Sequence, residues 1–111
     1  MRLYLLEDLT SENVKAITDR LNEMELSGGM EGIYWLPCPT EMLSDVQQEH
    51  ADECGPHCMA VEIDGPTLRM ELLVRARNKL RCDCVSYASP ELRAHMIQYI
   101  DDMLVDLGIY V

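Results

Sequence analysis

The amino-acid sequence predicts an α+β fold, namely a two-layer sandwich in which a largely antiparallel sheet carries helices packed on one face. Strand-like and helix-like segments alternate in the first half, and three strand-like runs joined by short turns precede a final helix-like segment. With 111 residues, of which 48% are hydrophobic, the chain is long enough for one core and too short for two. We therefore expect residues 1–111 to form a single domain, with residues 37–57 as an inserted helix and loop segment. A ferredoxin-like sandwich carrying this insertion is one concrete version.

The first half of the sequence predicts a strand, a helix and a second strand. Residues 3–7 are mainly apolar and precede Thr10, whose hydroxyl can cap a helix. Apolar residues then recur every three or four positions, which is typical of an amphipathic helix. These residues are Val14, Ile17, Leu21 and Met24. Ser27-Gly28-Gly29 ends this helix, and residues 32–36 form the second expected strand, which stops at Pro37-Cys38-Pro39.

The second half predicts a helix, a three-stranded meander and a last helix. Thr40 is placed to cap a helix that ends at Gly55-Pro56, and four of its residues share one face. These residues are Leu43, Val46, His50 and Cys54. The meander is expected over residues 58–63, 68–76 and 80–87. Ser89-Pro90 then begins the last helix, because a capping side chain followed by proline favours a helix start.

Counting along two-residue hairpin turns gives the register of the meander. Glu62 should face Arg69, and Arg75 should face Cys82. One face of the meander is then apolar, whereas the other carries arginines and cysteines. The cysteines on that second face are Cys58, Cys82 and Cys84. Because cysteine is usually buried, we expect this face to be covered, either by residues 37–57 or by another copy of the chain.

Charge and composition exclude several classes of partner. Nine basic and twenty acidic residues give a formal charge of −11, which repels nucleic acid and anionic membranes. The first residues meet acidic positions too early for a signal peptide, and no apolar run has the length of about 20 residues that spans a membrane. We therefore expect a cytoplasmic protein whose five cysteines are thiols or metal ligands and do not form a disulfide framework.

A dense group of ligand-type residues lies between positions 50 and 58. His50 and Cys54 are one helical turn apart, and the Gly-Pro turn brings His57 and Cys58 back towards them. Four such nitrogen and sulfur ligands suit tetrahedral zinc, with Cys38, Cys82 or Cys84 as possible substitutes. The alternative is that His50 and Cys54 are buried helix residues and that His57 caps a turn.

Three functional hypotheses follow from these observations. The first is a non-catalytic module that binds another protein or itself, through the cysteine-bearing and arginine-bearing sheet face or the methionine-rich last helix. The second is a zinc-binding domain that uses the segment from His50 to Cys58. The third is a cysteine-based enzyme or redox sensor, in which Cys38 or Cys84 is the nucleophile or Arg75 and Arg81 activate a neighbouring thiol.

Overall fold

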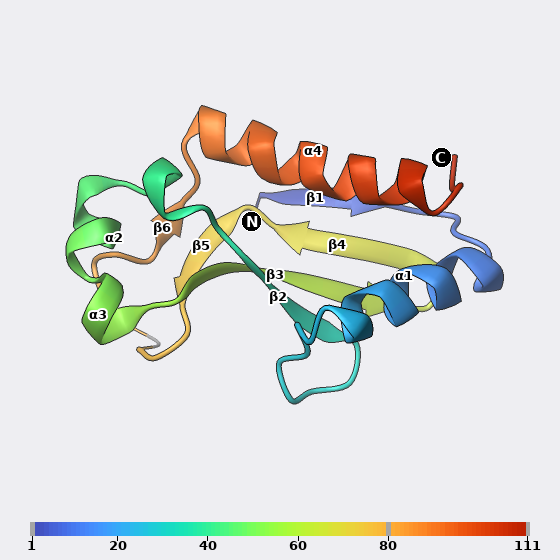
Figure 1. Cartoon of the computed structure of the whole chain (residues 1–111), viewed down its shortest axis with the longest axis horizontal. Coiled ribbons are helices and arrows are strands. Elements are labelled where there is room, and N and C mark those ends of the chain that lie inside the picture. Colours follow the sequence, from blue (N-terminus) through green and yellow to red (C-terminus); the bar gives the residue numbers. More distant parts are fainter. Residues whose placement is uncertain (1, 80, 111) are drawn as a thin grey trace.

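A computed structural model describes residues 2–79 and 81–110 and shows an α+β fold (Figure 1). The elements in chain order are β1 (Leu3–Leu6), α1 (Ser11–Glu23), β2 (Ile33–Pro37), a 3-10 turn (Thr40–Met42), α2 (Asp45–Glu49), α3 (Ala51–Cys54), β3 (His57–Asp64), β4 (Thr67–Glu71), β5 (Leu73–Ala76), β6 (Ser86–Tyr87) and α4 (Pro90–Asp106). The strands form one antiparallel sheet, and the long helices α1 and α4 lie on one side of it. The predicted two-layer fold class is thus confirmed.

The sheet is organised around β3, the longest strand. β2 pairs with one edge of β3, and β4 and β5 share the other edge. β1 pairs with the far edge of β4, and β6 pairs with β5. The predicted hairpin register is confirmed, because Asp64 faces Thr67 and Glu62 faces Arg69. The ferredoxin-like version is not confirmed: that arrangement places a helix before its last strand, whereas β3, β4 and β5 here follow one another directly.

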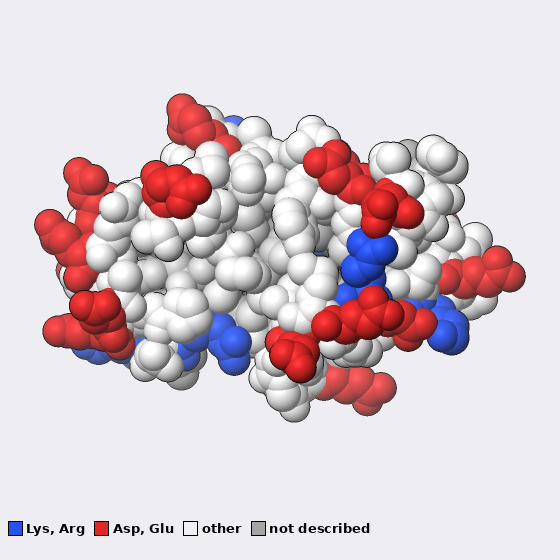
Figure 2. Space-filling view, in the orientation of Figure 1, with Lys and Arg blue, Asp and Glu red and all other residues white. Residues whose placement is uncertain are grey.

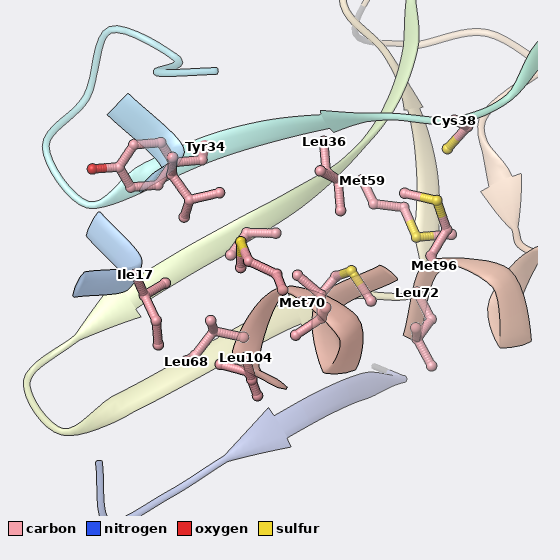
Figure 3. Close-up of a cluster of buried hydrophobic side chains, with 14 of the residues drawn as sticks. Ile17, Tyr34, Leu36, Cys38, Met59, Leu68, Met70, Leu72, Met96 and Leu104 are labelled. Carbon is pink, nitrogen blue, oxygen red and sulfur yellow. The ribbon is translucent and has the colours of Figure 1, made fainter. Parts of the chain in front are cut away.

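The core lies between the sheet and the two long helices (Figure 3). Ile17 of α1 and Met96 of α4 are almost fully buried against Met59 and Met70 of the sheet. The predicted helix starts are confirmed, because Thr10 accepts a hydrogen bond from the Asn13 amide and Ser89 accepts one from the Leu92 amide. Methionine side chains thus take much of the volume that phenylalanine fills in other cores, since the chain has eight Met and no Phe.

The inserted segment differs from the predicted continuous helix. Thr40 begins only a 3-10 turn, and α2 begins after Ser44. Ser44 and Gln47 form a reciprocal capping box, which satisfies two backbone amides at this helix start. The helical path is interrupted at His50, where the backbone has φ −93° and ψ 5°, and α3 follows.

The third strand of the meander is much shorter than predicted. The pairing breaks at Leu72, whose amide donates to Arg2 O and whose carbonyl accepts from the Ala88 amide. As a result Arg75 faces Cys58, and the expected pairing of Arg75 with Cys82 is wrong. Only residues 86–87 of the expected strand 80–87 pair with β5, and residue 80 lies outside the described residues.

Among residues 2–79 and 81–110, no helix combines the length and the apolar composition of a membrane-spanning segment.

Candidate metal centre

Two of the candidate ligands are held by the end of the inserted segment. His50 lies at the junction of α2 and α3, and the Cys54 amide donates to His50 O at 2.8 Å. This single turn places both side chains on the same side of the helix. α3 stops at Gly55, whose backbone is extended before Pro56, and a side chain at this position would collide with Ala51 O.

The other two candidate ligands are held by a turn between β5 and β6. The Val85 amide donates to Cys82 O at 3.0 Å, and this closes a tight turn around Cys82 and Cys84. The Gln47 side chain donates to Cys84 O at 3.0 Å and so fixes the turn against α2. At the other end, the Asn78 amide donates to Cys54 O at 3.0 Å. The two segments that carry the ligand residues are therefore joined by hydrogen bonds on both sides of the cluster.

Four ligand atoms converge between these segments. His50 Nδ1 lies 3.0 Å from Cys82 Sγ and 3.8 Å from Cys54 Sγ, and the two sulfurs are 3.6 Å apart. Together with the Cys84 sulfur, all four atoms lie within 4.8 Å of one another. Cys54 and Cys84 are buried, whereas His50 and Cys82 are partly exposed. We call the set His50, Cys54, Cys82 and Cys84 the ligand cluster.

The spacing within the ligand cluster matches the geometry of tetrahedral zinc. Bonds of about 2.3 Å to sulfur and about 2.0–2.1 Å to nitrogen place neighbouring sulfurs about 3.8 Å apart and a sulfur about 3.5 Å from a nitrogen. The observed sulfur–sulfur separation of 3.6 Å is close to the first value, and the nitrogen–sulfur separations of 3.0 and 3.8 Å lie on either side of the second. One imidazole and three thiols are also a known donor set for structural zinc.

The thiols of the ligand cluster differ in acidity. Hydrogen bonds from the Cys84 backbone amide and thiol, joined by those from Cys54 and His50, lower the pKa of Cys82 to about 6. Burial, reinforced by the neighbouring sulfurs, raises the pKa of Cys84 to about 12, and burial also raises the pKa of Cys54. Cys82 is therefore the most readily deprotonated of the three thiols. A divalent cation would favour loss of the thiol protons.

His57 and Cys58, the other two residues of the predicted zinc site, are not in the ligand cluster. Both are buried at the start of β3, and Cys58 pairs with Pro37 on one side and Arg75 on the other. His57 pairs with Ala76, and its Nε2 has no hydrogen-bond partner in the described part of the chain. Burial, with a smaller effect from nearby His50, lowers the pKa of His57 and so favours the neutral ring.

Cys38, proposed from the sequence as a nucleophile or a substitute ligand, lies at the margin of the main core (Figure 3). Its amide donates to His57 O at 3.0 Å, which continues the pairing of β2 with β3. Burial raises the pKa of Cys38 to about 12. The thiolate that nucleophilic catalysis requires is therefore strongly disfavoured at neutral pH.

The sequence signal for the second half of the cluster was the spacing of Cys82-Asp83-Cys84. A strand at this position would place both sulfurs on the same side, but an isolated C-x-C motif is a weak signal for a metal site, so the sequence offers these cysteines only as substitute ligands. In the structure the chain leaves the sheet after Ala76, and the turn brings both sulfurs to α3. The convergence is thus a result of tertiary structure.

Comparisons with protein-family models, curated proteins and solved structures gave no match. The functional argument therefore rests on the residues and geometry of this chain.

Proposed function

We propose that this protein is a zinc-binding domain in which His50, Cys54, Cys82 and Cys84 hold one structural zinc ion. The observation that supports this proposal is the convergence of one imidazole nitrogen and three sulfurs within 4.8 Å. A tetrahedral ion requires such convergence, and one imidazole with three thiols is a donor set that holds structural zinc.

The number of protein ligands favours a structural role over a catalytic one. A catalytic zinc ion keeps one coordination position for water or substrate, whereas four protein ligands fill a tetrahedral ion. The ion would connect α2 and α3 to the turn before β6. These elements pack around a small second cluster, which contains Cys54, Ala76 and Cys84 and is separate from the main core. Such a small apolar cluster supplies little stabilisation of its own, so a metal ion is well placed to complete it.

Elemental analysis tests the proposal directly. Protein purified without chelators should contain about one zinc ion per chain, and removal of that ion should lower the thermal midpoint of unfolding. In a cobalt-substituted sample, sulfur-to-cobalt charge-transfer absorption would show that thiolates are ligands. Metal-free protein that unfolds at the same temperature before and after addition of zinc would contradict the proposal.

A second candidate function, redox sensing by thiols, is favoured by the contact between Cys54 and Cys82. Their sulfurs are 3.6 Å apart, and the Cys82 thiol has the lowered pKa. A peroxide would oxidise the Cys82 thiolate to a sulfenic acid with release of hydroxide. The Cys54 thiol would then displace water and leave a disulfide. Peptide mapping after peroxide treatment of zinc-free protein should find this disulfide, and accumulation of sulfinic acid at Cys82 would contradict the sensor role.

A further inference from the structure

No helix among the described residues packs on the face of the sheet opposite α1 and α4, and the loop that carries Gly28 and Met30 borders this face. We call it the open face. It is formed by alternate side chains of β1 to β5, and it contains a hollow of about 410 Å³. The hollow is lined by apolar and charged residues in roughly equal number. The apolar lining includes Leu3, Met30, Ile33, Trp35 and Ala60.

The middle row of the open face carries apolar side chains on both sides of the Glu71 carboxylate, with Leu3 on one side and the Ala60–Trp35 pair on the other. Leu3 is 42% exposed and Met30 is 66% exposed, and both border the hollow beside Trp35. Trp35 lies beneath Gly28, where any side chain would collide with the indole ring. A glycine at this point therefore keeps the tryptophan accessible from the hollow. Exposed apolar patches framed by charged residues are typical of protein–protein contact sites.

The charged residues of the open face are distributed unevenly between its two ends. At the start of β3, Arg75 pairs with Cys58, and Arg77 lies 5.2 Å from the centroid of the Trp35 ring. At the end of β3, Glu62 and Asp64 accept hydrogen bonds from Arg69. The pairing positions of Cys58 and Asp64 are six residue steps apart along an extended strand, which corresponds to about 20 Å. Because Arg75 is paired with Glu71, Arg77 supplies the excess positive charge at one end of the open face, whereas at the other end Glu62 and Asp64 outnumber Arg69.

The charge balance of the open face also differs from that of the whole chain. The chain carries a net charge of −11, and Figure 2 shows acidic side chains along much of the margin of the helix-bearing side. On the open face, three arginines stand beside three acids. They are Arg69, Arg75 and Arg77, with Glu62, Asp64 and Glu71. Two copies can therefore approach through this face without the repulsion that acidic surfaces produce.

We propose that two copies of this chain associate through their open faces. The two-fold axis would lie in the plane of the interface and run across the strands. The basic end of each copy, at Arg75 and Arg77, then lies against the acidic end of its partner, at Glu62 and Asp64. The apolar centres meet between them, as in the aligned packing of two sheets. A second copy offers an opposite charge to each end of the open face, because the same surface carries a basic end and an acidic end.

The mass of the protein in solution tests whether the dimer forms. Sedimentation equilibrium should show a dimer of 12.7 kDa chains that dissociates on dilution. Replacement of Trp35 by serine should weaken association by removing the central aromatic side chain, with circular dichroism as the check that the variant is folded. A wild-type protein that remains monomeric up to about 1 mM would overturn the proposal, because even weak specific pairs form at that concentration.

A charge-swap experiment tests which ends of the open face meet. Arg77→Glu and Asp64→Arg should each raise the dimer dissociation constant by about tenfold, because each creates two like-charge contacts across the two-fold axis. An equal mixture of the two variants should recover the wild-type value, because both contacts in the mixed dimer join opposite charges. Lys15→Glu is the matched control for Arg77→Glu. It also replaces a positive charge by a negative one, but on the exposed surface of α1, and should leave the dimer dissociation constant unchanged. A dimer unaffected by the Trp35, Arg77 and Asp64 variants would place the interface elsewhere and overturn this assignment.

Discussion

Cys82 differs from the other cysteines of this chain in exposure and acidity. Cys38, Cys54, Cys58 and Cys84 are buried, whereas Cys82 is partly exposed and has its pKa lowered to about 6. Its sulfur contacts both the His50 ring and the Cys54 thiol. A thiolate that is accessible from solvent is the ligand that an incoming cation meets first. We therefore expect Cys82 to be the residue on which metal capture depends most.

Substitution of Cys82 by serine should weaken zinc binding at least about 100-fold, since loss of a ligand should exceed the effect of changing an outer-shell contact. The measurement is competition with a chromophoric chelator of known affinity. Cys58→Ser is the matched control, because it makes the same cysteine-to-serine change near this end of the sheet at a residue outside the ligand cluster. Equal loss of zinc in both variants would show that the cluster assignment is wrong.

Gln47 supports the ligand cluster without belonging to it. Its side-chain amide donates to Cys84 O and to Ser86 Oγ, and its carbonyl oxygen accepts from the Ser44 amide. Gln47→Ala should lower the free energy of unfolding by about 1–3 kcal/mol, because it leaves the carbonyl of buried Cys84 unsatisfied. Urea denaturation of the zinc-bound protein measures this change. Gln98→Ala, which removes only an exposed hydrogen bond to Asp102, should change stability by less than about 0.5 kcal/mol.

At the scale of elements, one hydrogen bond joins the first strand to the last helix. Tyr4 of β1 donates to the Asp101 carboxylate of α4. Burial, together with this acceptor, raises the pKa of Tyr4 to about 12 from its ordinary value near 10. The folded state therefore holds the Tyr4 hydroxyl proton more tightly than the unfolded state does. Its contribution to stability is complete below pH 10 and is lost as the pH rises through about 12.

Tyr4→Phe should therefore lower the free energy of unfolding by about 1 kcal/mol at neutral pH. The difference between wild type and variant should shrink between about pH 10 and 12, as the wild-type tyrosine ionises. Paired denaturant titrations across this range measure the difference and cancel the contributions of other titrating groups. A difference that stays constant up to pH 12 would show that the Tyr4 proton is not involved.

Local sequence signals predicted the elements that local chemistry determines. Thr10 and Ser89 begin α1 and α4 as expected, and Asp64 and Thr67 close the hairpin. The errors arise where distant partners decide the backbone. The backbone of Leu72 is hydrogen-bonded to Arg2 and Ala88, both of which are remote in sequence, and the pairing with β3 breaks at this point. Periodicity along one segment contains no information about such partners.

At the scale of the whole molecule, the same distinction applies to the candidate site. His50 and Cys54 were identified because one helical turn separates them. Their association with Cys82 and Cys84 depends on how the meander leaves the sheet, which hairpin counting did not predict. The sequence therefore indicates the residue types and half of the ligand cluster, whereas the tertiary fold determines the other half.

Metal removal should affect one end of the molecule selectively. The ligand cluster shares Cys54 and Cys84 with the small second cluster, whereas the β3–β4 hairpin and α4 belong to the main core. We expect chelation to accelerate amide hydrogen exchange in α2, α3 and residues 82–86, with little change in the hairpin and α4. Mass spectrometry of peptic fragments measures this pattern. Uniform acceleration across the chain would show that the metal stabilises the whole fold, and no change would contradict a structural role.

The order of the ligand residues along the chain has a consequence for biosynthesis. Cys54 and Cys82 are 28 positions apart, and β3, β4 and β5 lie between them. At about 5–20 residues per second, the ribosome makes His50 and Cys54 some seconds before the remaining two ligands. An incomplete pair of ligands retains a metal ion poorly. The proposed zinc ion should therefore bind only after residues 82–84 have been synthesised, so that metal loading can begin before α4, which is part of the main core, has been made.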